Sequence, residues 1–293
     1  MALEFEPISL ARQEEYHKAL FSCPDRASSD YAFANIWGWA EHYGLEWAFH
    51  KNMVFIRQTK PETVCWAPVG PWHEYDWFGC KAMVEAGKFT RVPDYLAKLW
   101  QEAYADRIEL TENRDHFDYL YSVEDLTELR GNKFHKKKNL LNQFVKKTDF
   151  NYHPMEPECV EEVLAMQAEW IAWYEENNPS EALVAENHAI ERVLHDFDRI
   201  GTLYGGAIRV DGRVIAYTVA EALDEETVVI HFEKGDVRYK GVYQAINQMF
   251  LKHNAQEFKY VNREQDLGDE GLRKAKLSYN PAFLLKKYEA RLK

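Results

Sequence analysis

Apolar residues in the second half of the chain recur at spacings that predict two helices followed by three strands. The helices are expected at residues 157–174 and 181–200, and the strands at 202–210, 213–223 and 226–234. Asp211 and Gly212 separate the first two strands, and this dipeptide suits the positive φ angles of a tight hairpin turn. We therefore predict an antiparallel three-stranded meander after two amphipathic helices.

The remainder of this half continues with alternating helices and strands. A helix that begins at Val242 carries its apolar residues on one face, and a short strand near residues 258–262 follows it and completes a β-α-β unit. A further helix over 268–277 ends at Asn280-Pro281, and residues 282–292 have the pattern of a last strand. The predicted order is α-α-β-β-β-α-β-α-β.

The first half repeats this order more roughly, although the two halves share negligible sequence identity. Helices are expected near 9–22, 28–42 and 94–105, and strands near 45–50, 53–58, 63–68, 107–111 and 119–123. The repetition predicts an α+β protein of two tandem domains, each a mixed, mainly antiparallel sheet flanked by helices. We expect these domains at 1–129 and 130–293, with a basic helix over 130–148 joining the two copies.

Composition excludes several protein classes. The chain of 293 residues is 46% hydrophobic and 14% aromatic, as folded proteins are, and six of its nine tryptophans lie between residues 37 and 77. A large core is the favoured use of these rings, and a ligand groove is the alternative. No apolar run approaches the roughly 18 residues of a membrane span, and the N-terminus lacks the apolar segment of a secretory signal. We therefore expect a cytoplasmic protein whose four separated cysteines are buried free thiols.

The charge of the chain is segregated. A net charge of −12 opposes the binding of polyanions such as tRNA. Between Leu129 and Lys147, however, seven residues are basic and none is acidic. Most such runs are solvated helix faces, and the alternative is a phosphate-binding strip around Lys136, Lys137 and Lys138. On a helix, Lys137 falls inside the apolar stripe of this segment, which an ordinary packed helix does not favour.

Common catalytic motifs are missing from the sequence. It has no P-loop, no G-x-S-x-G elbow, no H-E-x-x-H motif and no dinucleotide-binding G-x-G-x-x-G motif. The eleven histidines are scattered without metal-ligand spacing, so we expect no metal site.

Two segments remain as candidates for chemistry. In the first, Arg238, Lys240 and Gly241 precede a helix whose first amides can bind a phosphate. In the second, polar residues crowd the end of the short strand near 258–262, where ligands of α/β sheets commonly bind. These residues are Asn262, Arg263, Glu264, Asp266, Arg273, Lys276, Ser278 and Tyr279. Turn geometry and loop solvation are the structural alternatives for the two segments.

Three strings in these segments resemble a known family. They are GNKFHKKKN at 131–139, EKGDVRYKGVYQAIN at 233–247 and NREQDLGDEGLRKAKLSYNP at 262–281. They look like bacterial proteins that share the C-terminal domain of phosphatidylglycerol lysyltransferases. That family resembles the Fem-type transferases that use aminoacyl-tRNA, and the resemblance implies two tandem domains of the GNAT (acyl-CoA N-acyltransferase) fold. The resemblance covers nearly the whole chain and is most specific in the second half.

The resemblance implies transfer of an aminoacyl group from aminoacyl-tRNA to an amine or hydroxyl acceptor, with a small molecule, a lipid headgroup or a peptide as the acceptor. Glu233 or Glu264 is the implied base, and Tyr279 is the implied acid for the leaving hydroxyl. Arg263, Arg273 and Lys276 would hold the terminal phosphates of the tRNA. Asp266 would bind the ammonium group of the donor, and Asn262 and Ser278 would contact substrate.

Two alternatives to this function stay open. One is an acyl-CoA-dependent N-acyltransferase, in which Arg238 and Gly241 bind the pyrophosphate of coenzyme A in a turn of the form [QR]-x-x-G-x-[GA]. Tyr243 stands in that turn where a small residue belongs. The other alternative is a module without catalytic activity that binds tRNA or a partner protein through the basic helix.

Overall fold

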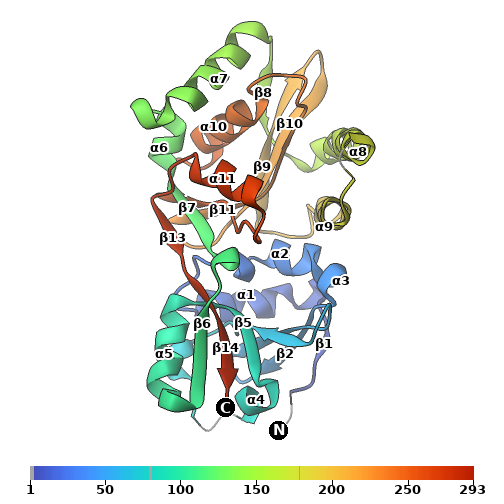
Figure 1. The fold of residues 1–293 in the computed structure, drawn as a ribbon. Helices are drawn as coiled ribbons and strands as arrows, with labels where there is room; N and C mark the ends of the chain where they lie inside the picture. Colours follow the sequence, from blue (N-terminus) through green and yellow to red (C-terminus); the bar gives the residue numbers. More distant parts are fainter. Residues whose placement is uncertain (1–2, 79–80, 178) are drawn as a thin grey trace. The chain divides into compact units, whose positions relative to one another are not determined.

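The computed structural model describes residues 3–78, 81–177 and 179–293, which form two compact units (Figure 1). Unit 1 comprises residues 1–118, 265–270 and 284–293, and unit 2 comprises residues 119–264 and 271–283. Within the described residues, each unit contains one seven-stranded sheet and several helices. Each unit is therefore a mixed α+β body with a sheet of its own.

The sheet of unit 1 is mainly antiparallel. In spatial order its strands are β1 (Glu6–Pro7), β2 (Glu46–His50), β3 (Met53–Gln58), β4 (Val64–Trp66), β5 (Lys88–Pro93), β14 (Lys287–Leu292) and β6 (Ile108–Glu112). Its helices are α1 (Gln13–Phe21), α2 (Phe33–Gly38), α3 (Ala40–Tyr43), α4 (Lys81–Ala86) and α5 (Asp94–Tyr104). β4 and β5 are parallel, and the other paired strands with a determined register are antiparallel.

The sheet of unit 2 has the same pattern. In spatial order its strands are β8 (Asn151–Pro154), β9 (Leu203–Val210), β10 (Arg213–Ala222), β11 (Thr227–Gly235), β12 (Tyr260–Asn262), β7 (Asp118–Ser122) and β13 (Phe283–Leu285). Its helices are α6 (Val123–Glu128), α7 (His135–Lys147), α8 (Val160–Asn177), α9 (Glu181–His195), α10 (Val242–Asn254) and most of α11 (Glu270–Leu277). β11 and β12 are the parallel pair of this sheet.

Each sheet contains one strand that a simple tandem arrangement of the two halves would place in the other sheet. In both sheets the sixth strand in spatial order comes from the other half of the sequence, because β14 pairs with β5 and β6 whereas β7 pairs with β12. The compact units are consequently discontinuous, unlike the contiguous ranges 1–129 and 130–293 that the sequence analysis expects. Strand exchange has no local sequence signal, since an exchanged strand has the same alternating pattern in either sheet.

Most of the expected elements are present. The hairpin between β9 and β10 turns at Asp211 and Gly212, which have φ angles of 49° and 80°. The meander of β9, β10 and β11 and the parallel β11-α10-β12 unit are confirmed. The expected strand over 282–292 is instead two strands, β13 and β14, which lie in different sheets. The sequence analysis missed the strands β1, β5 and β8 and the short helices α4 and α6.

The aromatic cluster of the first half is largely core, as expected. Trp47, Trp66, Trp72 and Trp77 are buried in unit 1, whereas Trp37 and Trp39 are half-buried. Cys23, Cys65 and Cys159 are buried free thiols, and Cys80 lies outside the described residues. No helix in the described ranges combines the length and the apolar character that crossing a membrane requires.

Candidate active site

The parallel strands of unit 2 separate partway along β11. Pairing between β11 and β12 joins residues 227–229 with 260–262, although β11 continues to Gly235. Beyond this point, Glu233 from β11 accepts a hydrogen bond from Nη2 of Arg263, the residue that follows β12, at 2.9 Å. The second carboxylate oxygen of Glu233 accepts from Nδ2 of Asn247 on α10 at 2.8 Å. Glu233 is thus held by two partners and fixes the guanidinium of Arg263.

Tyr279 lies against this ion pair. Arg263 is 4.9 Å from the centroid of the Tyr279 ring, and Nζ of Lys137 on α7 is 3.8 Å from the same centroid. The Tyr279 hydroxyl accepts a hydrogen bond from Nε2 of Gln244 on α10 at 2.8 Å. Nζ of Lys276 donates to the backbone carbonyl of Arg263 at 2.6 Å. The buried phenol therefore lies against two cations, Lys137 and Arg263, and Glu233 is the carboxylate that pairs with Arg263.

The electrostatics of this cluster favour a neutral phenol next to charged groups. Burial raises the pKa of Tyr279 above its ordinary value, and Arg263 works against that rise. Burial also lowers the pKa of Lys137, and the charge of Arg263 adds to the effect. Burial alone would lower the pKa of Arg263, but Glu233 outweighs burial and raises it. At neutral pH the tyrosine keeps its proton, and any phenolate formed during a reaction would lie beside two cations.

A second polar group in unit 2 is built around His231 of β11. Its Nδ1 is 3.0 Å from Oε1 of Glu264. Its Nε2 is 3.4 Å from Oε2 of Glu221, a distance that allows an ion pair but not a well-aligned hydrogen bond. Burial alone would lower the pKa of His231, but the two carboxylates outweigh burial and raise it to about 9. Glu264 has a φ angle of 58°, a conformation that residues other than glycine seldom adopt. Glu264 is therefore the partner of a buried imidazolium.

The raised pKa of His231 predicts a loss of stability at alkaline pH. The unfolded imidazole has a pKa of about 6.5, so the folded state binds the proton more tightly. This stabilisation is fully present below about pH 6.5 and is lost as the pH rises through about 9. Between about pH 6.5 and about pH 9, the free energy of unfolding measured with urea should decrease by up to roughly 3 kcal/mol. The variant His231→Gln should show a weaker dependence of this free energy on pH. An equal pH dependence in the variant would contradict this prediction.

The turn before α10 differs from a phosphate cradle. Arg238 is exposed and makes a double contact with Asp236, with Nη2 at 2.5 Å and Nε at 2.9 Å. Gly241 has a φ angle of 92°, and a Cβ atom there would lie 2.2 Å from the carbonyl oxygen of Leu140 on α7. Gly241 therefore permits close packing of α10 against α7. Lys240 is exposed, and the ring of Tyr243 is half-buried with its hydroxyl 3.3 Å from Nε1 of Trp170.

A cavity of about 350 Å³ lies beside this turn in unit 2. Its lining includes Trp170, Trp173, Tyr174 and Tyr239, together with the paired residues Asp236 and Arg238. Trp170 and Tyr174 are in contact at a centroid distance of 4.1 Å. The cavity thus offers flat aromatic surfaces next to the exposed guanidinium groups of Arg213 and Arg238, each of which pairs with a carboxylate.

The other expected site residues are dispersed. Lys136 and Lys138 are exposed on α7, and Ser278 is exposed and bonds the carbonyl of Ala275. Arg273 is half-buried on α11. The side chain of Asn262 is buried and accepts from the amide of Glu264 at 2.7 Å. Asp266 belongs to unit 1, where it is fully buried and pairs with Arg114 at 3.2 Å.

Sequence reasoning missed five residues around these two groups: Tyr121, Glu221, His231, Gln244 and Asn247. Gln244 and Asn247 are three positions apart on one helix, a spacing that places them on the same face and could have drawn attention. His231 and Glu233 are two positions apart in the sequence, a spacing that places side chains on the same side of a regular strand and is a second available signal, although the register of β11 against β10 shifts at His231. In the described ranges, no group of three or more His, Cys, Asp or Glu side chains is arranged to hold a metal ion.

Residues 23–291 match the protein family described as "Phosphatidylglycerol lysyltransferase, C-terminal". The chain belongs to this family. A conserved protein of unknown function from Bacteroides thetaiotaomicron VPI-5482 is 31% identical, with 99% of this chain and 100% of that chain covered and a TM-score of 0.87.

More distant solved structures share the fold. The structure of L-PGS from Bacillus licheniformis is 12% identical at a TM-score of 0.62, with 89% of this chain and 92% of that chain covered. FemX is 8% identical at a TM-score of 0.57, with 98% and 97% covered. The expected α+β fold of tandem GNAT-like domains, as in Fem-type proteins, is thereby confirmed.

A curated relative, an uncharacterized protein of Mycoplasmoides gallisepticum, is 25% identical over 173 residues. The match covers 58% of this chain and 54% of the relative, so the chain spans about half the length of the curated relative that it matches. Membership of the phosphatidylglycerol lysyltransferase C-terminal family places the chain among aminoacyltransferase-like proteins.

Proposed function

We propose that the chain transfers an aminoacyl group from aminoacyl-tRNA to an amine or hydroxyl acceptor, and that unit 2 carries the reaction. The observation that supports this most is the cluster of Tyr279, Arg263 and Lys137 at the point where β11 and β12 separate. Three groups converge there from α7, from the end of β12 and from the segment after α11. Membership of the lysyltransferase C-terminal family supports the same reaction class.

In this proposal the acceptor attacks the ester carbonyl carbon, and the bond between that carbon and the ribose oxygen breaks. Tyr279 donates its proton to the leaving ribose oxygen. Arg263 and Lys137 stabilise the phenolate that results, because both cations lie within 5 Å of the ring centroid. The phenolate then takes the proton that the acceptor releases, which restores the phenol and balances the protons.

The two candidate bases have other roles in this arrangement. Glu233 is a positioning residue, since both of its oxygens are bonded and one of them holds Arg263. Glu264 neutralises the imidazolium of His231 on the neighbouring part of β11. Arg263 acts on the reacting tyrosine directly, whereas Arg273 and Lys276 on α11 remain proposed contacts for the phosphates of the donor.

Acyl-CoA is the less supported donor. A pyrophosphate at the turn before α10 would meet the carboxylate of Asp236, which already neutralises Arg238. Gly241, the other expected contact, packs against the backbone of α7. A tRNA donor needs a basic surface, and the exposed Lys136 and Lys138 next to the half-buried Lys137 provide one. Calorimetry with acetyl-CoA separates the two donors, because micromolar binding would favour the acyl-CoA alternative.

The basic surface of α7 predicts salt-dependent binding of tRNA. Replacing Lys136 and Lys138 together by Glu should weaken binding of bulk aminoacyl-tRNA at low salt by roughly tenfold or more, since phosphate contacts release counterions. The slope of log Kd against log salt should also become shallower. Fluorescence anisotropy with labelled tRNA over a salt series measures both quantities.

The matched control is Lys146→Glu with Lys147→Glu, which makes the same charge change at the other end of α7. We expect this control to weaken binding much less. Equal effects of the two double variants would show that only net charge matters, and no binding at low salt would remove tRNA as the donor.

A further inference from the structure

A bulge interrupts the sheet of unit 1 at β5. Val92 pairs with Tyr288 and Phe89 pairs with Ala290, so Thr90 and Arg91 together face the single residue Glu289 of β14. Arg91 has a φ angle of 59° in this bulge. Bulges redirect side chains and are frequent beside functional sites, and positive φ in a residue with a long side chain needs support from its surroundings.

The position of this bulge corresponds to the candidate active site of unit 2. Thr90 is the last residue of β5 that pairs with the parallel strand β4, and Arg91 follows it. In unit 2, Asn262 is the last residue of β12 that pairs with the parallel strand β11, and Arg263 follows it. The two units thus place an arginine at the same point of the same sheet pattern. This repetition points to a second site in unit 1.

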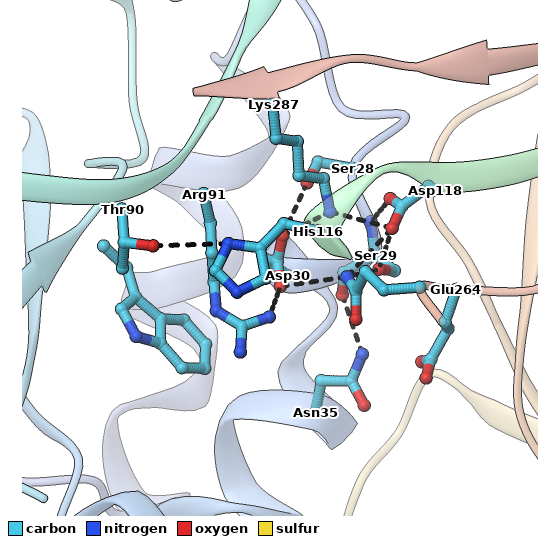
Figure 2. A network of polar contacts seen from close by, with 12 residues as sticks. Ser28, Ser29, Asp30, Asn35, Thr90, Arg91, His116, Asp118, Glu264 and Lys287 are labelled. Atoms are coloured by element: carbon cyan, nitrogen blue, oxygen red, sulfur yellow. Dashed lines mark hydrogen bonds and ion pairs between the residues drawn. The ribbon is translucent and has the colours of Figure 1, made fainter. Parts of the chain in front are cut away.

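Arg91 is nine-tenths buried, and its guanidinium has one strong partner. Nη1 donates to Oδ1 of Asp30 at 2.6 Å, and the Trp66 ring centroid is 4.5 Å from the guanidinium carbon. Nε of Arg91 is buried without a hydrogen-bond partner in the part of the chain that the structure describes. Figure 2 shows Asp30 between Arg91 and Lys287, both of which bond its carboxylate. An unpaired buried donor on a cation is costly, and a bound anion is one way to satisfy it.

Arg91 lines a polar cavity of about 730 Å³ in unit 1. Glu289, half-buried, lies on the same wall, and Thr90, Asn113 and His116 all contact its Oε1, at 2.7, 2.9 and 3.4 Å. No hydrogen bond from the described residues reaches Oε2 of Glu289. The exposed lining has both signs of charge, with Lys88 and Arg291 as well as Glu109 and Asp115. A lining of this kind suits a polar molecule without net charge better than a phosphate or an acyl chain.

We propose that this cavity binds an α-amino carboxylate, with Arg91 contacting the carboxylate and Oε2 of Glu289 accepting from the ammonium group. A free amino acid and a short peptide share this chemistry. Arginine is the side chain best suited to a carboxylate, and a partly desolvated carboxylate is the matching group for an ammonium ion. Binding of a ligand in this cavity of unit 1 does not require the transferase reaction proposed for unit 2.

Isothermal titration calorimetry of the whole chain tests this proposal with a panel of free amino acids and dipeptides. Each compound has two matched forms, an amide that lacks the carboxylate and an N-acetyl form that lacks the ammonium group. We expect at least one free amino acid or dipeptide to bind, and both matched forms to bind at least roughly tenfold more weakly. Whether amino acids or dipeptides bind more tightly identifies the source. Inorganic phosphate should bind more weakly than either.

Two variants assign the contacts. Glu289→Gln should raise Kd by roughly tenfold, whereas Glu112→Gln, on the neighbouring strand and outside the cavity lining, should leave it unchanged. Arg91→Lys keeps a charge beside Asp30 and should also weaken binding, with circular dichroism confirming that the variant is folded. The proposal is overturned if no compound binds, if phosphate alone binds, or if binding is unaffected by Glu289→Gln.

Discussion

Tyr279→Phe is expected to reduce the rate of aminoacyl transfer by roughly a hundredfold or more, because it removes the proton that the leaving ribose oxygen requires. The affinity for aminoacyl-tRNA should change little, since the ring and its contacts with Arg263 and Lys137 remain. Single-turnover transfer of a radiolabelled amino acid from tRNA into an extract of bacterial lipids and peptides measures the rate. Anisotropy with labelled tRNA measures the affinity separately.

Tyr121→Phe is the matched control for this experiment. The Tyr121 hydroxyl makes a hydrogen bond to the carbonyl of Lys276 at 2.9 Å, and the side chain is also buried in unit 2. Both variants lose one hydroxyl, which costs about 1 kcal/mol of stability. Transfer should be nearly normal in Tyr121→Phe. If Tyr279→Phe transferred at the wild-type rate, the assignment of the acid would be wrong.

Lys287→Met is expected to lower the free energy of unfolding by about 3–5 kcal/mol, because it removes the cation that two buried carboxylates share. Nζ of Lys287 bonds Asp30 and lies 2.8 Å from Oδ1 of Asp118, and all three side chains are buried in unit 1 (Figure 2). Burial alone would raise the pKa of Asp30, but Lys287 and Arg91 outweigh burial and lower it. Urea unfolding at neutral pH measures the loss.

The next residue provides the control for Lys287. Lys286 is half-exposed and pairs with the similarly exposed Glu112 at 2.6 Å, so Lys286→Met should lower the free energy of unfolding far less than Lys287→Met does. The two variants delete the same charge from adjacent positions of the same segment. Equal losses of stability in both variants would show that the burial of Lys287 does not determine its contribution to stability.

The sequence predicted the local elements of the fold better than their arrangement. The hairpin at Asp211-Gly212 and the helix that begins at Val242 depend on turn chemistry and on apolar spacing, which are local properties. β5 was missed because its alternation is interrupted by the bulge at Arg91, which a string of letters does not show. The place of β14 in the first sheet depends on pairing with residues about 180 positions earlier.

The candidate site was partly visible in the sequence. Lys137 stood out because it interrupted an apolar stripe, and the structure explains the interruption, since its ammonium group lies over the ring of Tyr279. Glu233, Arg263 and Tyr279 were expected near one another, and they are in contact. The partners Gln244 and Asn247 were missed because uncharged amides on a helix have no distinctive pattern.

Other groupings had no sequence signal. Asp30, Asp118 and Lys287 come from three distant segments, and only the folded chain of unit 1 brings them together. Asp266 was expected beside Arg263 because the two are three residues apart, but the chain crosses from unit 2 to unit 1 after Glu264. Proximity along the chain is therefore a poor guide where one unit is built from several segments.

One transfer experiment tests most directly whether aminoacyl-tRNA is the donor. Radiolabelled bulk aminoacyl-tRNA and radiolabelled acetyl-CoA are each incubated with the chain and with the same extract of bacterial lipids and peptides. We predict that the label of aminoacyl-tRNA moves to an acceptor. An amine acceptor gives an amide that is stable to mild base, and a hydroxyl acceptor gives a new ester. Tyr279→Phe should largely abolish this transfer. Label that stays on tRNA while acetyl-CoA supports transfer would contradict the account.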